Sequence, residues 1–155
     1  MKIHTYASEQ LLPGIALGEA WAFFATPLNL NRITPPHLHF EILSKDAGQP
    51  MFKGQIIRYK VQPLPLYRTT WVTEIAEVNP MVSFVDVQKQ GPFAHWHHTH
   101  LFFQEQSGVK MYDNLQYTIP FGRAGQVVGP FIHRKVTEIF SYRRLKLEEI
   151  FPVRK

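Results

Sequence analysis

The chain has no cysteine among its 155 residues. This absence excludes a disulfide framework, a thiolate zinc site and a cysteine nucleophile, and it is consistent with a reducing compartment. No apolar run reaches the roughly 18–20 residues that cross a bilayer, and residues 1–4 lack the apolar core of a signal peptide. We therefore expect a cytoplasmic protein.

Charged residues are also few, at 19%, and 17 Lys and Arg against 12 Asp and Glu leave a formal charge of +5. The basic residues are scattered until the last quarter, where Glu138, Glu148 and Glu149 interrupt them. This pattern argues against nucleic acid as a partner and favours no more than a weak contact with an anionic membrane surface. The oligomeric state stays open.

Hydrophobic residues make up 45% of the chain, which excludes a disordered protein. The length, with no repeat or linker, predicts one domain over residues 1–155. Twelve Phe, six Tyr and three Trp are more rings than a small core needs, so the composition favours an apolar pocket.

The first 36 residues predict one strand and two short helices. Alternation over residues 2–12 ends at a Pro-Gly pair, as strands do. An amphipathic helix is expected over residues 20–25, and a second over residues 27–33, with Thr26 as its N-cap.

The middle of the chain reads almost entirely as strand, punctuated by Gly and Pro. Short connections between consecutive strands predict an antiparallel meander. The expected strands lie near residues 39–45, 52–62, 66–78, 81–90, 95–106 and 109–120.

The spacing of apolar residues changes to a helical period after Gly129-Pro130, and this period continues for about six turns. Such a helix is about 30 Å long, and the sheet is the only large partner for its apolar stripe. The sequence therefore predicts an α+β fold in which a curved antiparallel sheet of about seven strands grips a long C-terminal helix. The stripe comprises Ile132, Val136, Ile139, Phe140, Leu147, Ile150 and Phe151.

A two-residue turn at Ser107-Gly108 would pair Gln106 with Val109 and set the last hairpin. Phe102 then lies opposite Asp113. The inner face of this hairpin collects most of the large apolar groups together with two imidazoles and a carboxylate. Its members are Trp96, His98, His100, Phe102, Met111, Asp113, Leu115, Tyr117 and Ile119.

A loop at residues 91–95 would likewise place Asp86 beside His100. On the helix, Arg143 shares the stripe of Phe140 and Leu147, so its guanidinium is expected to face Asp113 or Asp86. We interpret this contact as a structural ion pair; a polar patch that orients a ligand at the end of an apolar cavity is the alternative, and both can hold together.

The histidine run at residues 95–100 raises the question of a metal site. His98 and His100 share one face of a strand, so both could reach one ion. Glu105, at cupin-like spacing, points to the opposite face, and the third ligand is therefore missing. We predict histidines hydrogen-bonded inside the sheet and no metal or cofactor; a metal-binding histidine cluster is the weaker alternative.

Other catalytic motifs are absent. Residues 122–125 lack the Lys-Ser or Lys-Thr of a phosphate-binding loop. None of the serines lies in a Gly-x-Ser-x-Gly elbow.

Several motifs together resemble the SRPBCC superfamily, which includes START, Bet v 1 and polyketide-cyclase-like proteins, and specifically its bacterial ligand-binding "cyclase/dehydrase" group. The resemblance spans nearly the whole chain and implies a helix-grip fold with an apolar cavity between sheet and helix. It is carried by Asn29-Leu30, Ile33-Thr34-Pro35-Pro36, Phe84-x-Asp86-x-Gln88-x-x-Gly91-Pro92-Phe93-x-x-Trp96-x-His98-x-His100-x-Phe102, Met111-x-Asp113, Tyr117-x-x-Pro120-x-Gly122 and Phe140-x-Tyr142-Arg143.

The resemblance implies binding or transport of a hydrophobic small molecule such as a lipid, quinone, sterol or polyketide. We expect the ligand between the C-terminal helix and the concave sheet. Its expected contacts are Trp71, Phe84, Asp86, Trp96, His98, His100, Phe102, Met111, Tyr117, Phe131, Val136, Ile139, Phe140 and Arg143.

The alternative is an enzyme of the aromatase/cyclase type. His98 or His100 would act as general acid or base, tuned by Asp86 or Asp113, and Tyr117 would polarise a carbonyl. A third possibility is an interaction module whose cavity is vestigial.

Overall fold

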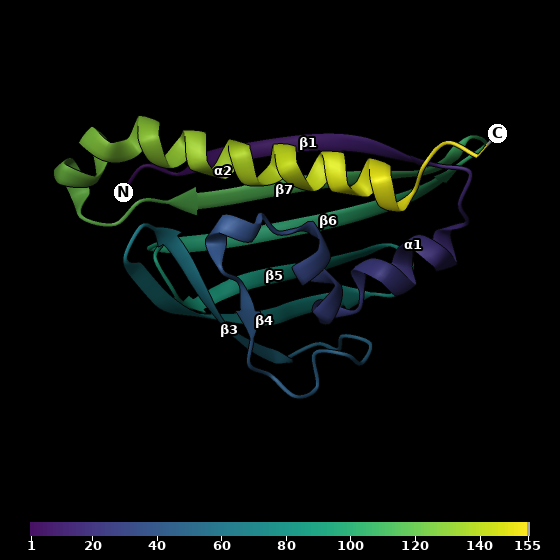
Figure 1. The fold of residues 1–155 in the computed structure, drawn as a ribbon, viewed down its shortest axis with the longest axis horizontal. Helices are drawn as coiled ribbons and strands as arrows, with labels where there is room; N and C mark the ends of the chain where they lie inside the picture. The colour runs from purple at the N-terminus through teal and green to yellow at the C-terminus, as the bar shows by residue number, and fades with distance from the viewer. Residues whose placement is uncertain (155) are drawn as a thin grey trace.

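The computed structural model describes residues 1–154 and has the predicted α+β architecture. One sheet and one long helix dominate it, with short helices after the first strand (Figure 1). The elements are β1 (His4–Pro13), α1 (Leu17–Phe24), the 3₁₀ helices η1 (Pro27–Ile33) and η2 (Pro36–Leu38), β2 (Glu41–Ile42), β3 (Ile56–Leu64), β4 (Tyr67–Asn79), β5 (Ser83–Gln90), β6 (His95–Glu105), β7 (Gly108–Thr118) and α2 (Gly122–Ile150).

The sheet is a seven-stranded antiparallel meander that closes back on its first strand. Its order is β1-β7-β6-β5-β4-β3-β2, so β1 lies beside the last strand. α2 crosses one face of this sheet, and η1 and η2 lie over the same face (Figure 1). The predicted helix-grip arrangement is confirmed.

The two short helices form nearly where the sequence predicts them. The second is a 3₁₀ helix with Thr26 at the N-cap position, but the Thr26 hydroxyl donates to the carbonyl of Ala22 at 2.8 Å rather than capping η1. The strand expected over residues 39–45 is reduced to two residues, Glu41–Ile42. None of the helices over residues 1–154 combines the length and the apolar character that a membrane span requires.

The C-terminal helix begins earlier than its period indicates. α2 starts at Gly122 and includes Pro130, which the sequence analysis placed before the helix. A proline inside a helix lacks the N–H for one backbone hydrogen bond. In the turns up to Pro130 the side chains are largely exposed, and only Gly125 and Gly129 are buried.

The last hairpin turns one residue earlier than predicted, which shifts every pairing partner by two residues. Glu105 pairs with Gly108, so the turn is Gln106-Ser107, and His100 rather than Phe102 lies opposite Asp113. We attribute the shift to Gly108, which begins β7 with a φ of +145°. Glycine adopts this backbone conformation more readily than any other residue. A shift of two residues leaves the same side chains on the inner face, so that prediction survives the wrong register.

The β5–β6 hairpin is also shifted by two residues. Asp86 pairs with His98, not with His100. The pairing ends at Val87 and His97, and beyond it the side chain of Gln88 folds onto the main chain of Phe93, a contact absent from the predicted five-residue loop.

Replacing Gly108 with alanine is expected to destabilise the protein by about 2 kcal/mol or more. A Cβ at this position would lie 2.1 Å from the carbonyl oxygen of Leu12, where the backbone of β1 cannot easily move away. Urea unfolding measures the change. Gly54→Ala is the control, since Gly54 also has a positive φ but nothing lies within 4 Å of its Cβ position; an equal loss in both variants would contradict the packing argument.

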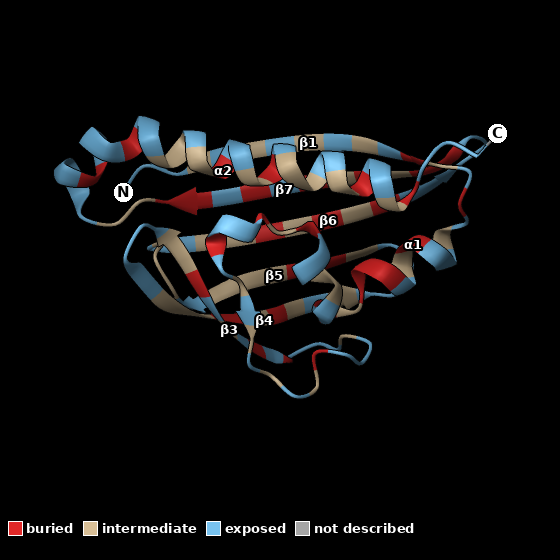
Figure 2. Ribbon diagram, viewed as in Figure 1, coloured by how far each residue is buried: buried red, intermediate tan, exposed pale blue. Residues whose placement is uncertain are grey.

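The core is divided along the helix (Figure 2). One cluster lies around α1 and the end of α2, with Phe23, Phe102 and Leu147 among its members. A second cluster, containing Leu115, Tyr117, Val136 and Phe140, joins the middle of α2 to β7. These clusters hold α2 against β1, β6 and β7, while the sheet curves away from the helix at β3 and β4.

Candidate functional site

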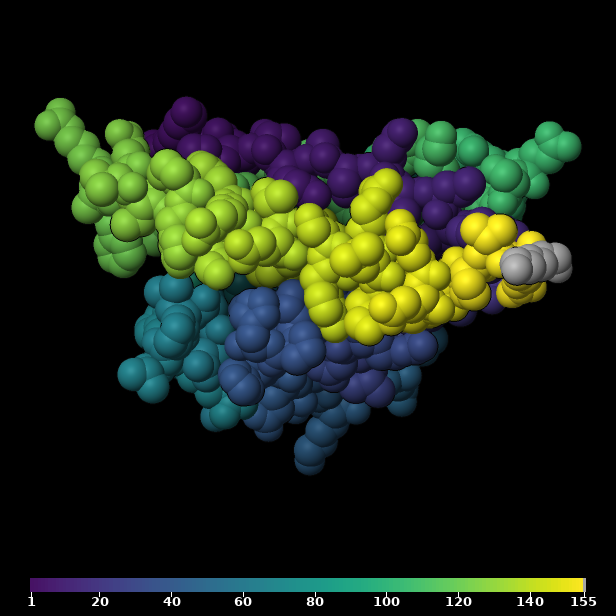
Figure 3. All heavy atoms as spheres, turned by 45° about the horizontal axis from the view of Figure 1, so that its top comes forward, coloured from purple at the N-terminus to yellow at the C-terminus, as the bar shows by residue number. Residues whose placement is uncertain are grey.

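A cavity of about 760 Å³ lies between the concave sheet and α2, with η1 and η2 at its side. This is the hollow that the helix-grip interpretation requires. In Figure 3 the atoms of α2 meet the blue atoms near residues 30–40, so the helix and the η1 region cover the cavity together. Exposed lining residues at Leu64, Tyr67 and Phe121 mark where it reaches solvent.

Most of the side chains expected to contact a ligand do line this cavity. They come from β4, β5, β6 and α2, and they are Trp71, Phe84, Asp86, Trp96, His98, His100, Phe131, Val136, Ile139 and Arg143.

Four other expected ligand contacts lie outside the cavity wall. Phe102 and Met111 belong to the core cluster beneath α1, and Tyr117 and Phe140 belong to the cluster between β7 and α2. The Tyr117 hydroxyl forms a hydrogen bond with His133 Nδ1, and burial raises its pKa. The structure thus places Tyr117 away from the position that a carbonyl-polarising role requires.

The other wall of the cavity was missed by sequence reasoning. This wall comes mainly from the η1–η2 segment and β3. The sequence-based prediction gives a strand over residues 52–62 but does not say which of its side chains face inward. The alternation of Ile57, Tyr59 and Val61 along β3 is a sequence signal that indicates this inner face. The missed apolar residues are Leu30, Ile33, Leu38, Phe40, Met51, Ile57, Tyr59, Val61 and Phe93.

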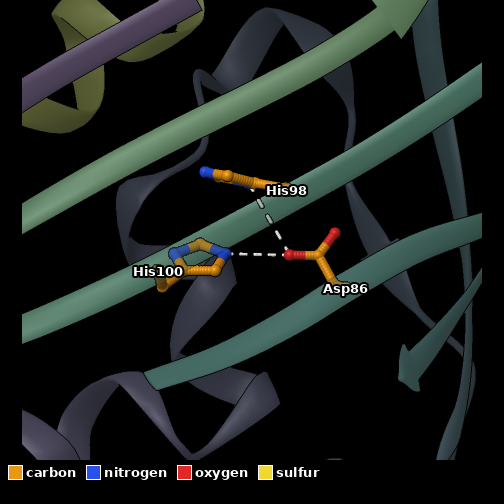
Figure 4. Close-up of side chains that lie close together, drawn as sticks. All are labelled: Asp86, His98 and His100. Atoms are coloured by element: carbon orange, nitrogen blue, oxygen red, sulfur yellow. Dashed lines mark hydrogen bonds and ion pairs between the residues drawn. The ribbon is translucent and has the colours of Figure 1, made fainter. Parts of the chain in front are cut away.

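The polar end of the cavity is a network of two imidazoles between two carboxylates. His98 Nε2 donates to Asp113 Oδ1 at 2.7 Å, and His100 Nε2 donates to Asp86 Oδ2 at 2.8 Å. The rings of His98 and His100 lie 3.8 Å apart between centroids. Figure 4 shows both histidines projecting from β6 toward Asp86 on β5.

The strand pairing explains why these four side chains meet. His98 and His100 are alternate residues of β6, so they share one face of the sheet. Asp86 on β5 is paired with His98, and Asp113 on β7 is paired with His100. Each histidine therefore contacts one carboxylate on its own row and one on the diagonal.

The network is largely removed from water, and its ionisation reflects that. Burial opposes the charge on Asp86 and Asp113, but hydrogen bonds and attraction from the two imidazoles outweigh it and lower the pKa of both carboxyls. Burial and the neighbouring His100 lower the pKa of His98. Burial also opposes charge on His100, yet contacts with both carboxylates raise the pKa of His100.

Arg143 reaches this network from α2, as the helix stripe predicts. Its Nη1 lies 4.0 Å from Asp113 Oδ1, and its guanidinium lies over the ring of Phe140 at 4.9 Å. The Nε atom is buried without a hydrogen-bond partner. Arg143 therefore ties the helix to the sheet and also brings a polar group to the cavity wall.

Gln88 holds the loop at another part of the cavity rim. Its Nε2 donates to the carbonyl of Phe93 at 2.6 Å, and its Oε1 accepts from the N–H of Phe93 at 3.2 Å. Phe93 in turn packs on Trp71 and Trp96. The amide of one side chain thus fixes an aromatic part of the wall.

Replacing Gln88 with alanine is expected to loosen this loop and cost about 1–2 kcal/mol, because two hydrogen bonds to the main chain of Phe93 are lost. Hydrogen exchange should quicken at residues 91–94 and stay unchanged in β1. Gln116→Ala, at an exposed position on β7, is the control. Unchanged exchange at residues 91–94 would show that Gln88 does not hold the loop.

Comparison with known proteins supports the fold through solved structures, and not through family profiles or curated sequences. No protein family profile matches the chain, and neither does any curated protein. Solved structures do match over nearly its full length.

Three of them illustrate the similarity. The Zhui aromatase/cyclase from Streptomyces sp. R1128 has a TM-score of 0.73 at 12% identity, covering 94% of this chain and 92% of that one. Protein CV1439 from Chromobacterium violaceum has a TM-score of 0.71 at 13% identity, with coverage of 96% and 97%. Ara h 8.0201 has a TM-score of 0.58 at 14% identity, with coverage of 96% and 99%. The fold implied by the resemblance to SRPBCC proteins is confirmed.

Proposed function

We propose that the protein binds and carries a hydrophobic small molecule in the cavity between α2 and the sheet. The observation that carries this proposal is the volume of about 760 Å³ behind a predominantly apolar wall. This volume lies within the range of pockets that take drug-sized ligands. A lipid, quinone, sterol or polyketide is the class of ligand that fits this wall.

Apolar burial supplies the driving force. At about 25 cal/mol per Å², a ligand that buries about 300 Å² of apolar surface gains about 7–8 kcal/mol before the costs of binding. The wall offers rings and branched aliphatic groups over most of its area. Asp86, His98, His100 and Arg143 at one end would orient a carbonyl or hydroxyl oxygen of the ligand.

Tryptophan fluorescence tests this proposal directly. Trp71 and Trp96 line the cavity. Trp21 does not line it, and packs on Phe84 and Phe102. Titration with a fatty acid, a sterol and a short-chain quinone should change the emission of the wild type and of Trp21→Phe, and change it far less in the double variant Trp71→Phe/Trp96→Phe. If none of the three ligands binds to the wild type, the proposal fails.

A second candidate function is catalysis of the cyclase or dehydratase type. The observation that favours it is the pair of carboxylate-bound imidazoles on the cavity wall, where a proton can reach a bound ligand. Structural neighbours named as aromatase/cyclases add to it. His98 would act as the base, because its lowered pKa leaves it neutral.

The two functions give different results in the same variants. With a poly-β-ketone substrate, His98→Ala and His100→Ala should abolish turnover and leave affinity within a few-fold if the protein is an enzyme. Affinity and stability that fall together would favour the binding function.

A further inference from the structure

Three potential metal-ligand atoms converge at the polar end of the cavity. Asp86 Oδ2, His98 Nδ1 and His100 Nε2 all lie within 4.8 Å of one another. Asp86 Oδ2 is 3.6 Å from His98 Nδ1 and 2.8 Å from His100 Nε2. Ligand bonds of about 2.0–2.2 Å would leave such atoms about 3–3.5 Å apart, so small side-chain movements suffice to place one ion between them.

A second carboxylate, that of Asp113, hydrogen-bonds His98 from behind and lies beside His100, whose Nδ1 has no hydrogen-bond partner. Asp113 Oδ1 accepts from His98 Nε2 at 2.7 Å and lies 3.1 Å from His100 Nδ1. These are the ring nitrogens that do not face Asp86. Metal-binding histidines commonly give their second N–H to a carboxylate, which fixes the tautomer and aims the other nitrogen at the ion.

The hydrogen bond to Asp113 leaves one acceptor of His98 in front of Asp86. Because His98 gives its proton to Asp113, Nδ1 of neutral His98 carries a lone pair toward the Asp86 carboxylate. His100 Nε2 shares one proton with Asp86 Oδ2, and an ion bound between these atoms would take the place of that proton. The three atoms therefore surround a position that suits positive charge.

The charge balance also leaves room for a cation. The site pairs two carboxylates, Asp86 and Asp113, with one guanidinium, that of Arg143, so a divalent ion would replace the proton that His100 shares with Asp86 as the further positive charge. The guanidinium of Arg143 forms its ion pair with Asp113 at 4.0 Å and forms none with Asp86.

We propose that Asp86, His98 and His100 bind one first-row divalent metal ion, with Asp113 as the residue that positions both imidazoles. Two imidazoles and one carboxylate suit Zn²⁺, Fe²⁺ or Co²⁺ better than Mg²⁺ or Ca²⁺. Glu105, at cupin-like spacing on the same strand, is not the third ligand; Asp86 on the neighbouring strand β5 takes that role instead.

This proposal goes beyond the proposed function. All three ligand residues line the cavity, whereas Asp113 does not. The remaining coordination positions would therefore face the cavity and accept water or an oxygen of a bound molecule. Binding of metal alone can be measured without any apolar ligand, so the two proposals fail independently.

The test is titration of the chelator-treated full chain with Co²⁺, followed by its visible absorption, and competition with Zn²⁺. We expect one ion per chain. Asp86→Asn and His98→Gln/His100→Gln should each weaken binding by at least about 100-fold, and Asp113→Asn by about 10–100-fold. The matched control is His95→Gln/His97→Gln on the opposite face of β6, where the two rings also lie near each other, at 6.4 Å.

Circular dichroism of each variant shows whether it is folded. Asp86→Asn keeps the shape of the side chain and serves if the double histidine variant does not fold. Stoichiometric binding that survives in His95→Gln/His97→Gln and is lost in Asp86→Asn supports the site. Absence of stoichiometric binding to the wild type, retention of wild-type affinity in Asp86→Asn, or its loss only in the His95/His97 control overturns it.

Discussion

Replacing Asp113 with alanine is expected to destabilise the protein by about 3–5 kcal/mol, the largest loss we predict for a single substitution. The carboxylate is 6% exposed and is the common partner of His98, His100 and Arg143. Its removal leaves two imidazoles and a guanidinium buried with too little negative charge, and breaking a buried ionic network by removing one partner costs this much. Urea unfolding monitored by circular dichroism measures the loss.

The neighbouring residue gives the control. Asn114 lies on the opposite face of β7 and is exposed, so Asn114→Ala should change the free energy of unfolding by less than about 0.5 kcal/mol. Asp113→Asn should fall between the two, because it keeps the volume and one acceptor. A loss below about 1 kcal/mol in Asp113→Ala would mean that the network does not support the fold.

Replacing Ile139 with aspartate is expected to lower the affinity for a hydrophobic ligand at least tenfold. Ile139 is half-buried on α2 and lines the cavity. A carboxylate at this position must lose water when an apolar molecule enters, or stay hydrated and keep the molecule out. A tenfold change corresponds to about 1.4 kcal/mol. Titration of the ligand that binds the wild type measures the difference.

Leu145→Asp is the matched control on the same helix. Leu145 is 59% exposed and lies outside the cavity wall, so its replacement should leave affinity and stability nearly unchanged. Equal affinity in Ile139→Asp and Leu145→Asp would place the ligand outside the cavity.

The sequence predicts the inner faces well because side chains alternate along a strand. Both hairpin registers are wrong by two residues, yet His98, His100 and Asp113 remain on the buried face. A register depends on the turn, and the turns here depend on Gly108 and on the side chain of Gln88 folding back onto the chain. Neither effect is contained in the hydrophobic pattern.

Other parts of the site depend on distant packing. The helical stripe from Ile132 onward predicts the middle of α2 but not the turns before Pro130, because most side chains there are exposed and add no apolar stripe. The wall formed by the η1–η2 segment and β3 likewise depends on contacts between elements, since η2 lies against β3 and η1 lies against α2. The contact of Asp86 with both histidines depends on the β5–β6 register.

The most direct test of the carrier function is mass spectrometry of an organic-solvent extract of the protein isolated from its native cells. We predict one apolar small molecule in near-stoichiometric amount, and much less of it in an extract of Ile139→Asp prepared in parallel. An extract of the wild type with no stoichiometric molecule, from a protein that also fails to bind the fatty acid, sterol and quinone, would contradict the central claim.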